Sequence, residues 1–269
     1  MFPARLTTAL VLLAGCITAL FILPSWLWGI LLLAVLAVAA WEWGALAGIG
    51  SALRLGYVLI IVGSAAGIGL AIAAGVARSG AVETVVYGVS LAFWLLVVLP
   101  LLALGGKAQP PSVLGLAGWV VLVPTWLALS RLQAQPAYLL ALLGIVWVAD
   151  SSAYLAGKAW GRHRLAPTIS PAKTWEGVAG AAVGVAVYYA VLYYLVPEWR
   201  WWHSWSGVVL VAGVGLLSVV GDLFESWIKR LAGAKDSGTL LPGHGGILDR
   251  IDSVTSSMPF AALLLLYIA

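Results

Sequence analysis

The sequence predicts an all-α integral membrane protein with about nine transmembrane helices and no soluble domain. Hydrophobic residues make up 63% of the 269 residues and charged residues only 9%, whereas about 25% charged residues is usual for globular chains. Apolar runs of about 20 residues, which suffice to cross a bilayer as a helix, recur along the whole chain. A membrane barrel would instead show short segments of alternating polarity. The composition therefore excludes an ordinary soluble domain.

Turn-forming residues divide the apolar runs into individual helices. Pro24, Pro136 and Pro197 each separate two consecutive runs. Residues 13–16 (LAGC) resemble a lipoprotein cleavage site, but the apolar run continues to Pro24 and favours a first transmembrane helix. The nine helices are expected at residues 6–23, 25–47, 55–76, 82–104, 113–132, 137–157, 175–196, 206–230 and 248–268.

The charged residues divide the chain into two parts. Residues 1–136 contain generic apolar helices, which we interpret as a scaffold that supplies dimer contacts. Residues 137–269 hold nearly all of the side chains suited to chemistry, and we interpret them as the catalytic region. Its cytoplasmic loops are expected at residues 158–174 and 231–247.

Positive charges predict the orientation of the helices, because Lys and Arg are enriched in cytoplasmic loops. With the N-terminus inside, eleven of the 14 Lys and Arg residues fall on the cytoplasmic side, and only Arg78, Arg131 and Arg200 fall outside. The net charge of +4 fits loops that face anionic lipid, and no nucleic-acid partner is expected. The single cysteine, Cys16, excludes an internal disulfide and a cysteine-based metal site.

The first charged stretch is DSSAYLAGKAWG, at the inner end of the sixth expected helix. Its Asp150 follows an apolar run, where an ionised carboxylate costs about 2.5–3.5 kcal/mol on insertion scales. One interpretation is a buried carboxylate paired with a cation such as Lys158, two turns later. The other is a contact between Asp150 and a substrate or metal.

The second stretch, SPAKTWEG, resembles the start of a helix. Ser170 is expected as the N-cap and Pro171 as the first helical residue. Lys173 and Thr174 would then lie in the first helical turn, where free N–H groups, a hydroxyl and an ammonium suit a phosphate. The alternative is a capped helix whose lysine only reaches the interface. The chain has no Walker A loop, so a P-loop NTPase is not expected.

The third stretch, residues 221–252, concentrates carboxylates. Asp222, Glu225 and Lys229 share one helix face, and Asp249 and Asp252 are one turn apart on the last helix. Like carboxylates repel in a low dielectric unless a cation separates them. Oxygen ligands favour Mg²⁺. The alternative is a structural ion-pair network between the last two helices.

Glycines and positive charges surround these carboxylates. Gly245 and Gly246 belong to a loop whose N–H groups can approach a ligand closely. The positive groups are Lys229, Arg230, Lys235, His244 and Arg250. The third stretch is therefore expected to bind a polyphosphate and its metal at the membrane surface.

Residues 226–252 read S-W-I-K-R, four residues, K-D-S-G, T-L, and L-P-G-H-G-G-I-L-D-R-I-D. This stretch resembles the signature of the phosphatidate cytidylyltransferases, or CDP-diacylglycerol synthases. The other two stretches also resemble motifs of that family, so the resemblance covers roughly the last 120 residues. One departure is Ala172, where many members carry a second lysine.

The resemblance implies that CTP and phosphatidic acid react to give CDP-diacylglycerol and pyrophosphate. It implies Mg²⁺ as cofactor, with a second cation left open, a homodimer, and a bacterial inner membrane location with the site facing the cytoplasm. Two alternatives remain: a CTP-dependent lipid kinase, such as a polyprenol kinase, and a non-enzymatic transporter.

Resemblance and chemistry together predict three sets of site residues. The catalytic residues would be Asp222, Asp249, Lys173 and His244. The metal ligands would be Asp222 and Asp249, with Asp252 and Glu225 as secondary candidates. The substrate-binding residues would be Asp150, Ser170, Thr174, Lys229, Arg230, Lys235, Asp236, Gly245, Gly246 and Arg250.

Overall fold

The computed structural model describes residues 14–76, 78–197, 199, 202–240 and 245–268. Among these residues, eight helical spans are long and apolar enough to cross a membrane, which agrees with the expected all-α membrane fold. Residues 14–22 are also helical, and the rest of the first expected helix lies outside the described residues. The elements are α2 (Ser25–Leu46), α3 (Ser51–Ala73), α4 (Ser79–Phe93), the π-helical turn η1 (Trp94–Val98), α5 (Leu99–Ala103), α6 (Pro111–Leu132), α7 (Pro136–Trp160), β1 (Arg164–Ala166), β2 (Ser170–Thr174), α8 (Trp175–Leu195), α9 (Trp205–Leu231) and α10 (Leu248–Ile268).

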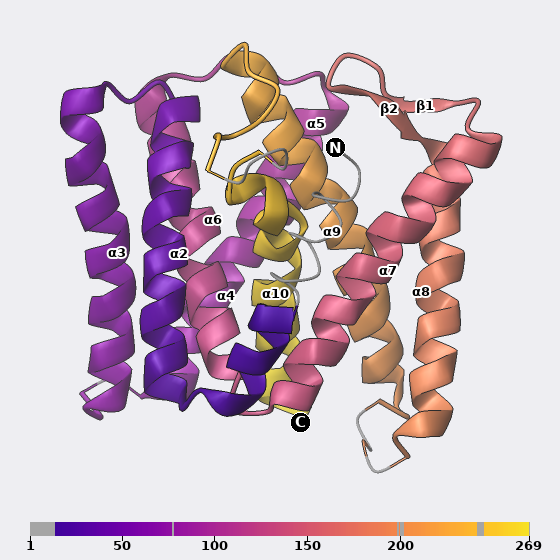
Figure 1. Cartoon of the computed structure of the whole chain (residues 1–269), viewed down its shortest axis with the longest axis horizontal. Coiled ribbons are helices and arrows are strands. Elements are labelled where there is room, and N and C mark those ends of the chain that lie inside the picture. Colours follow the sequence, from indigo (N-terminus) through magenta and orange to yellow (C-terminus); the bar gives the residue numbers. More distant parts are fainter. Residues whose placement is uncertain (1–13, 77, 198, 200–201, 241–244, 269) are drawn as a thin grey trace.

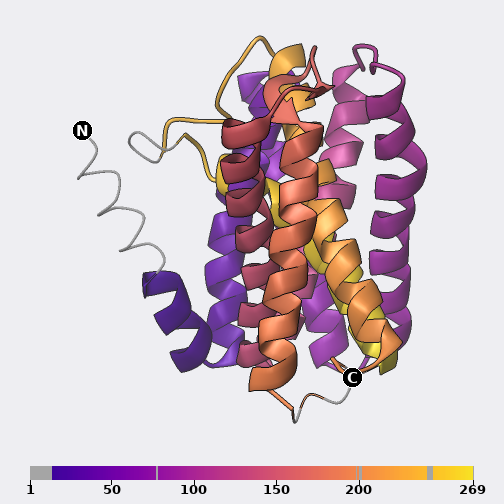
Figure 2. The same ribbon diagram turned by 90° about the vertical axis from the view of Figure 1, so that its right-hand side faces the viewer.

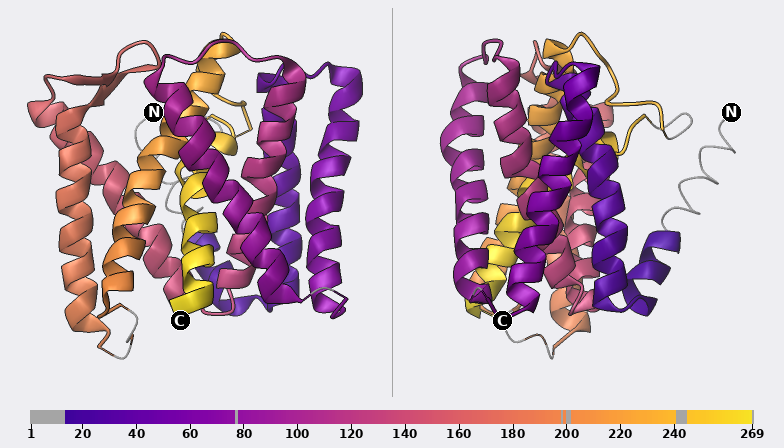
Figure 3. Two further views of the ribbon diagram at one scale, coloured as in Figure 1. Left: turned by 180° about the vertical axis from the view of Figure 1, so that it is seen from behind. Right: turned by 90° about the vertical axis from the view of Figure 1, so that its left-hand side faces the viewer.

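The helices stand side by side, with their connections at the two ends of the bundle (Figure 2). Helices α2 and α3 lie at one side, α7 and α8 lie at the other, and α10 lies between them (Figure 1). The β1–β2 hairpin and the segment after α9 lie at one end, and the C-terminus lies at the opposite end (Figure 1). The span formed by α4, η1 and α5 crosses the other helices obliquely (Figure 3), touching α10 through α4 and α9 through α5.

An aromatic cluster joins α2, η1 and α9. The ring of Phe224 lies 5.4 Å from that of Trp94 and 6.2 Å from that of Trp43, measured between centroids. Tilted and edge-to-face pairs at such distances add to the stability given by burial alone. Because Glu42 precedes Trp43 and Glu225 follows Phe224, this packing also holds two carboxylates near the same end of the bundle.

Helix α10 contains a proline whose missing N–H is compensated by a neighbouring helix. Pro259 leaves the carbonyl of Thr255, four residues earlier, without its intrahelical donor. The Thr125 hydroxyl of α6, which also contacts the carbonyl of Val121 at 2.6 Å, lies 3.1 Å from that oxygen. In a bilayer such a contact matters because there is no water to satisfy the carbonyl.

The segment between α7 and α8 forms a β-hairpin, so the expected N-cap at Ser170 is wrong, whereas the expected span of residues 175–196 agrees with α8. Strands β1 and β2 pair antiparallel, with Arg164 opposite Thr174 and Ala166 opposite Ser170. Helix α8 begins only at Trp175, and Thr174 is its N-cap, because its hydroxyl accepts a hydrogen bond from the N–H of Gly177 at 3.1 Å. Lys173 and Thr174 therefore precede the helix. Residues 170–174 are extended and paired with β1, so they cannot form the first helical turn after Ser170.

Candidate active site

A pocket of about 850 Å³ lies at the end of the bundle that carries the hairpin. Its walls come from α7, both strands, α8, α9, the segment after α9, and α10. Three stretches that are far apart in the sequence therefore supply one pocket. Ten of the predicted site residues line it: Asp150, Ser170, Lys173, Thr174, Asp222, Lys229, Asp236, Asp249, Arg250 and Asp252.

Of the predicted residues that the structure describes, five lie outside the pocket lining: Glu225, Arg230, Lys235, Gly245 and Gly246. Arg230 instead donates from Nε to the carbonyl of Ile169 at 3.2 Å, which attaches the hairpin to the end of α9. His244 lies outside the described residues, so its part in the reaction stays a prediction.

Three aspartates and Lys173 line one side of the pocket. The Nζ of Lys173 lies 2.6 Å from Oδ2 of Asp222. Asp150 and Asp252 interact electrostatically with the same two residues. Three aspartates grouped around one lysine supply the oxygen ligands that a further cation would need.

Lys158, the cation expected to pair with Asp150 in the alternative interpretation, is not its partner. Among the described salt bridges none joins these two residues. The ammonium of Lys158 instead lies over the ring of Tyr154, 5.8 Å from its centroid. Asp150 lines the pocket together with Lys173 and Asp222, and this position leaves contact with a substrate or metal as its remaining interpretation.

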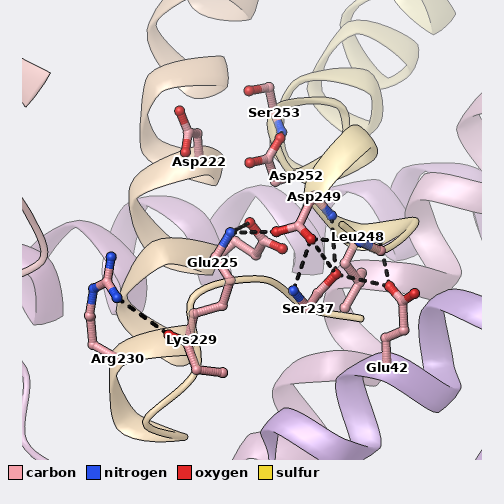
Figure 4. Close-up of polar contacts among 12 residues, drawn as sticks. Glu42, Asp222, Glu225, Lys229, Arg230, Ser237, Leu248, Asp249, Asp252 and Ser253 are labelled. Atoms are coloured by element: carbon pink, nitrogen blue, oxygen red, sulfur yellow. Dashed lines mark hydrogen bonds and ion pairs between the residues drawn. The ribbon is translucent and has the colours of Figure 1, made fainter. Parts of the chain in front are cut away.

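A second ion-pair group lies beside the first (Figure 4). Lys229 donates from Nζ to Oε2 of Glu225 at 2.7 Å and to Oδ1 of Asp249 at 2.6 Å. Glu225 and Lys229 are one turn apart on α9, and Asp249 lies in the first turn of α10. Lys229 therefore joins the two helices at the pocket.

The second oxygen of Asp249 holds the loop that precedes α10. Its Oδ2 accepts hydrogen bonds from the backbone N–H groups of Ser237 and Gly246, both at 2.8 Å, and lies 3.0 Å from the hydroxyl oxygen of Ser237. Gly245 has a φ of +83°, and a Cβ there would collide with the Asp249 carboxylate. Glycine is therefore required at position 245 for two reasons: the positive φ, and the lack of room for a Cβ beside Asp249.

Sequence reasoning missed two residues that support this arrangement, Glu42 and Ser237. Both side chains are buried, and the Ser237 hydroxyl donates to Glu42 Oε2 at 3.0 Å (Figure 4). The available signal was the position of Glu42, which is a single carboxylate within the apolar helix α2. An ionisable residue inside a membrane helix is a functional candidate by default.

The arrangement fits Mg²⁺ held partly by a substrate. Among the described residues no group of three Asp, Glu, His or Cys side chains is placed to hold a metal ion by itself. Mg²⁺ is usually bound by one or two carboxylates together with substrate phosphates. The excess of carboxylates around Lys173 suits that mode of binding.

An apolar groove of about 320 Å³ runs beside the polar pocket, between α8 and α9. Its walls include Val185, Ala212 and Leu216. Val178 and Val219 line both the groove and the pocket. A molecule with a charged head and an apolar tail could therefore occupy both at once.

Comparison with known proteins agrees with this geometry. The profile of the cytidylyltransferase family matches residues 3–268. The chain belongs to the cytidylyltransferase family.

Relatives of this family that resemble the chain share one name. A phosphatidate cytidylyltransferase from Pseudomonas aeruginosa is 38% identical over 98% of this chain and 97% of its own length. One from Haemophilus influenzae is 31% identical over 97% of each chain. One from Staphylococcus aureus is 45% identical over 48% of this chain and 49% of its own length.

Proposed function

We infer that this chain is a phosphatidate cytidylyltransferase, which converts CTP and phosphatidic acid into CDP-diacylglycerol and pyrophosphate. The observation that carries this inference is the similarity, over nearly the full length of both chains, to relatives with that name. The polar pocket that adjoins an apolar groove supports it, because phosphatidic acid has a phosphate head and acyl chains.

In this proposal the reaction needs positioning and charge neutralisation more than a strong base. A lipid phosphate is already anionic near neutral pH, and its oxygen would attack the α-phosphorus of CTP while pyrophosphate leaves. Lys173 and Lys229 would neutralise developing negative charge, since both residues line the pocket. Ser170 and Thr174 would each donate a hydroxyl proton to a phosphate. The hydroxyl proton of Thr174 is still available, because Thr174 only accepts in its hydrogen bond with the N–H of Gly177.

Mg²⁺ would neutralise the triphosphate when it is bound. Asp222 and Asp249 would hold it, with Asp252 and Glu225 nearby as secondary candidates. This role requires Lys173 and Lys229 to give up part of their present contacts to the two aspartates. A second cation and the leaving-group role of His244 stay predictions.

Location and assembly follow from the same proposal. The relatives are bacterial, and we place the chain in the bacterial inner membrane. The pocket would face the cytoplasm, because its end of the bundle carries the expected inner loops with Lys158, Arg164, Lys229 and Arg250. The homodimer stays a prediction.

The assay for this function separates two reactions. Purified protein in detergent is incubated with CTP labelled in the cytidine, phosphatidic acid and Mg²⁺. A cytidylyltransferase transfers the label to an organic-soluble lipid and releases pyrophosphate. A lipid kinase leaves labelled CDP in the aqueous phase and needs a lipid alcohol as acceptor, so that result would overturn the inference.

A further inference from the structure

Glu42 is a buried carboxylate that lies outside the pocket lining but holds one of its walls. It occupies α2, close to the inner end of that helix, and only 5% of the residue is exposed. Among the described salt bridges none includes Glu42. Among the described residues, the Glu42 carboxylate therefore accepts hydrogen bonds from uncharged donors and forms no ion pair.

The donors all belong to the segment that leads into α10. Oε1 of Glu42 accepts from the N–H of Ile247 at 3.0 Å. Oε2 accepts from the N–H of Leu248 at 2.9 Å and from the Ser237 hydroxyl at 3.0 Å. The first N–H groups of a helix have no intrahelical partner, and a carboxylate there also complements the helix dipole.

Ser237 connects Glu42 with Asp249. Its hydroxyl oxygen lies 3.0 Å from Oε2 of Glu42 and 3.0 Å from Oδ2 of Asp249 (Figure 4). Two carboxylates, one from α2 and one from α10, thus lie within hydrogen-bond distance of one serine hydroxyl, whose single proton is donated to one of them at a time. A displacement of Glu42 would move Ser237 and, through it, the carboxylate of Asp249.

The loop backbone is packed directly on the Glu42 carboxylate. A Cβ added at Gly238 or at Gly246 would collide with the carboxylate oxygens of Glu42. Neither glycine has a positive φ. Close approach of the loop to Glu42, and not backbone conformation, therefore explains glycine at these two positions.

We propose that Glu42 is a positioning residue for the transfer reaction, which sets the place of Asp249 by holding Ser237 and the start of α10. The proposal rests on the proposed function only in that Asp249 belongs to the reacting site. Glu42 touches no pocket surface, so it acts through other residues and does not contact substrate. The N-terminal helix α2 thereby contributes to a site whose lining begins at Asp150.

The test replaces Glu42 by glutamine, which keeps the shape of the side chain. The amide has one oxygen, and its NH₂ group must face at least one N–H or O–H donor, so part of the contact to Ser237, Ile247 and Leu248 is lost. In Glu42→Gln we expect faster amide hydrogen exchange in peptides that cover residues 245–249. We also expect kcat to fall roughly ten- to a hundredfold and the Mg²⁺ concentration for half-maximal rate to rise.

Glu83→Gln is the matched control. Glu83 is also a fully buried glutamate in a membrane helix, but it pairs with Arg131 at 2.7 Å and lies near the start of α4, away from the pocket. This variant should lower thermal stability without changing the Mg²⁺ requirement or the exchange at residues 245–249. Equal changes in both variants would show that Glu42 is only a stabilising residue and would overturn the proposal.

Ser237→Ala provides a second, independent variant. It removes the hydroxyl that lies between Glu42 and Asp249, but it leaves the two backbone contacts of Glu42 and the bond from the Ser237 N–H to Asp249 intact. It should raise the Mg²⁺ requirement, and the double variant should lose little more activity than the worse single variant, because both changes break the same link. Normal kinetics in Ser237→Ala, or fully additive losses, would overturn the proposal.

The exchange measurement needs no activity, so it separates this proposal from the proposed function. If the wild-type protein forms no CDP-diacylglycerol, the proposed function is contradicted. If amide exchange at residues 245–249 is still faster in Glu42→Gln than in wild type, the role of Glu42 in holding this segment is nevertheless supported. Unchanged exchange in Glu42→Gln would contradict the anchoring whatever the reaction is.

Discussion

The ammonium of Lys173 lies 2.6 Å from the carboxylate of Asp222, and this ion pair joins strand β2 to helix α9 across the pocket. From the sequence, Lys173 was expected at a helix start, where its charge would be unfavourable without a bound anion. The hairpin instead places Lys173 among carboxylates that need its charge. Removing this lysine is therefore expected to destabilise the empty protein.

We predict that Lys173→Met lowers both activity and stability. Loss of a charge-assisted contact to phosphate, worth about 1.5–3 kcal/mol, should reduce kcat/KM roughly ten- to a hundredfold. Asp222 would lose its ion pair, and Asp150 and Asp252 would lose a nearby positive charge, so the Tm without divalent cations should fall. Added Mg²⁺ should restore part of that loss.

The measurement is the Tm of the detergent-solubilised variant with and without MgCl₂, together with kcat/KM for each substrate. Lys107→Met, an exposed lysine outside the pocket lining, is the control and should behave as wild type. A Tm unchanged in either condition would contradict the role of Lys173 in balancing the carboxylates.

Asp249→Asn should abolish most turnover while the protein remains folded. The side-chain amide must direct its NH₂ group either at the Lys229 ammonium or at the N–H groups of Ser237 and Gly246, and both are donors. We expect a loss of more than about a hundredfold in kcat, comparable to removing one electrostatic contact from a reacting centre. Near-normal rates at saturating Mg²⁺, from protein that elutes as wild type in size exclusion, would exclude Asp249 as a ligand.

Gly246→Ala should disturb the loop without straining its backbone. The added Cβ would collide with the Ser237 hydroxyl and the Glu42 carboxylate, and we expect kcat to fall at least about tenfold because Asp249 is displaced. Gly56→Ala in α3 is the control, since a Cβ there meets nothing within 4 Å and alanine favours a helix by about 1 kcal/mol. Similar kinetics for the two variants would show that the packing of the loop on Glu42 is not critical.

The pocket end of the bundle should face the cytoplasm. With Cys16 replaced by serine, single cysteines at positions 107 and 162 should resist a membrane-impermeant thiol reagent in intact cells and react after permeabilisation. A cysteine at exposed Ala134, in the turn between α6 and α7, should react in intact cells. The opposite labelling pattern would invert the orientation and remove the access of CTP to the pocket.

The transmembrane helices could be predicted from the sequence because hydropathy and turn residues act locally. The predicted end at residue 47 for α2 and the predicted start at residue 248 for α10 agree with the structure within one residue. The three charged stretches were also recognisable, since a charged side chain in so apolar a chain needs a reason to be there. Their resemblance to one family agrees with the match over residues 3–268.

Local patterns were insufficient where two segments compete for the same backbone groups. Ser170 and Pro171 have the residue types of a helix start, but the strand pairing of Ala166 with Ser170 takes precedence and moves the cap to Thr174. Asp150 and Lys158 have the spacing of an ion pair, but the fold directs Asp150 toward Lys173 and Asp222.

Tertiary structure alone decided which distant residues support the site. Glu42 and Ser237 are 195 positions apart, and no periodicity relates them. They meet because the packing of α2 against α9 and α10 leaves the carboxylate of Glu42 beside N–H groups that lack a helical partner. Hydropathy determines that each helix enters the membrane, but the polar contacts that remain inside depend on which helices pack together.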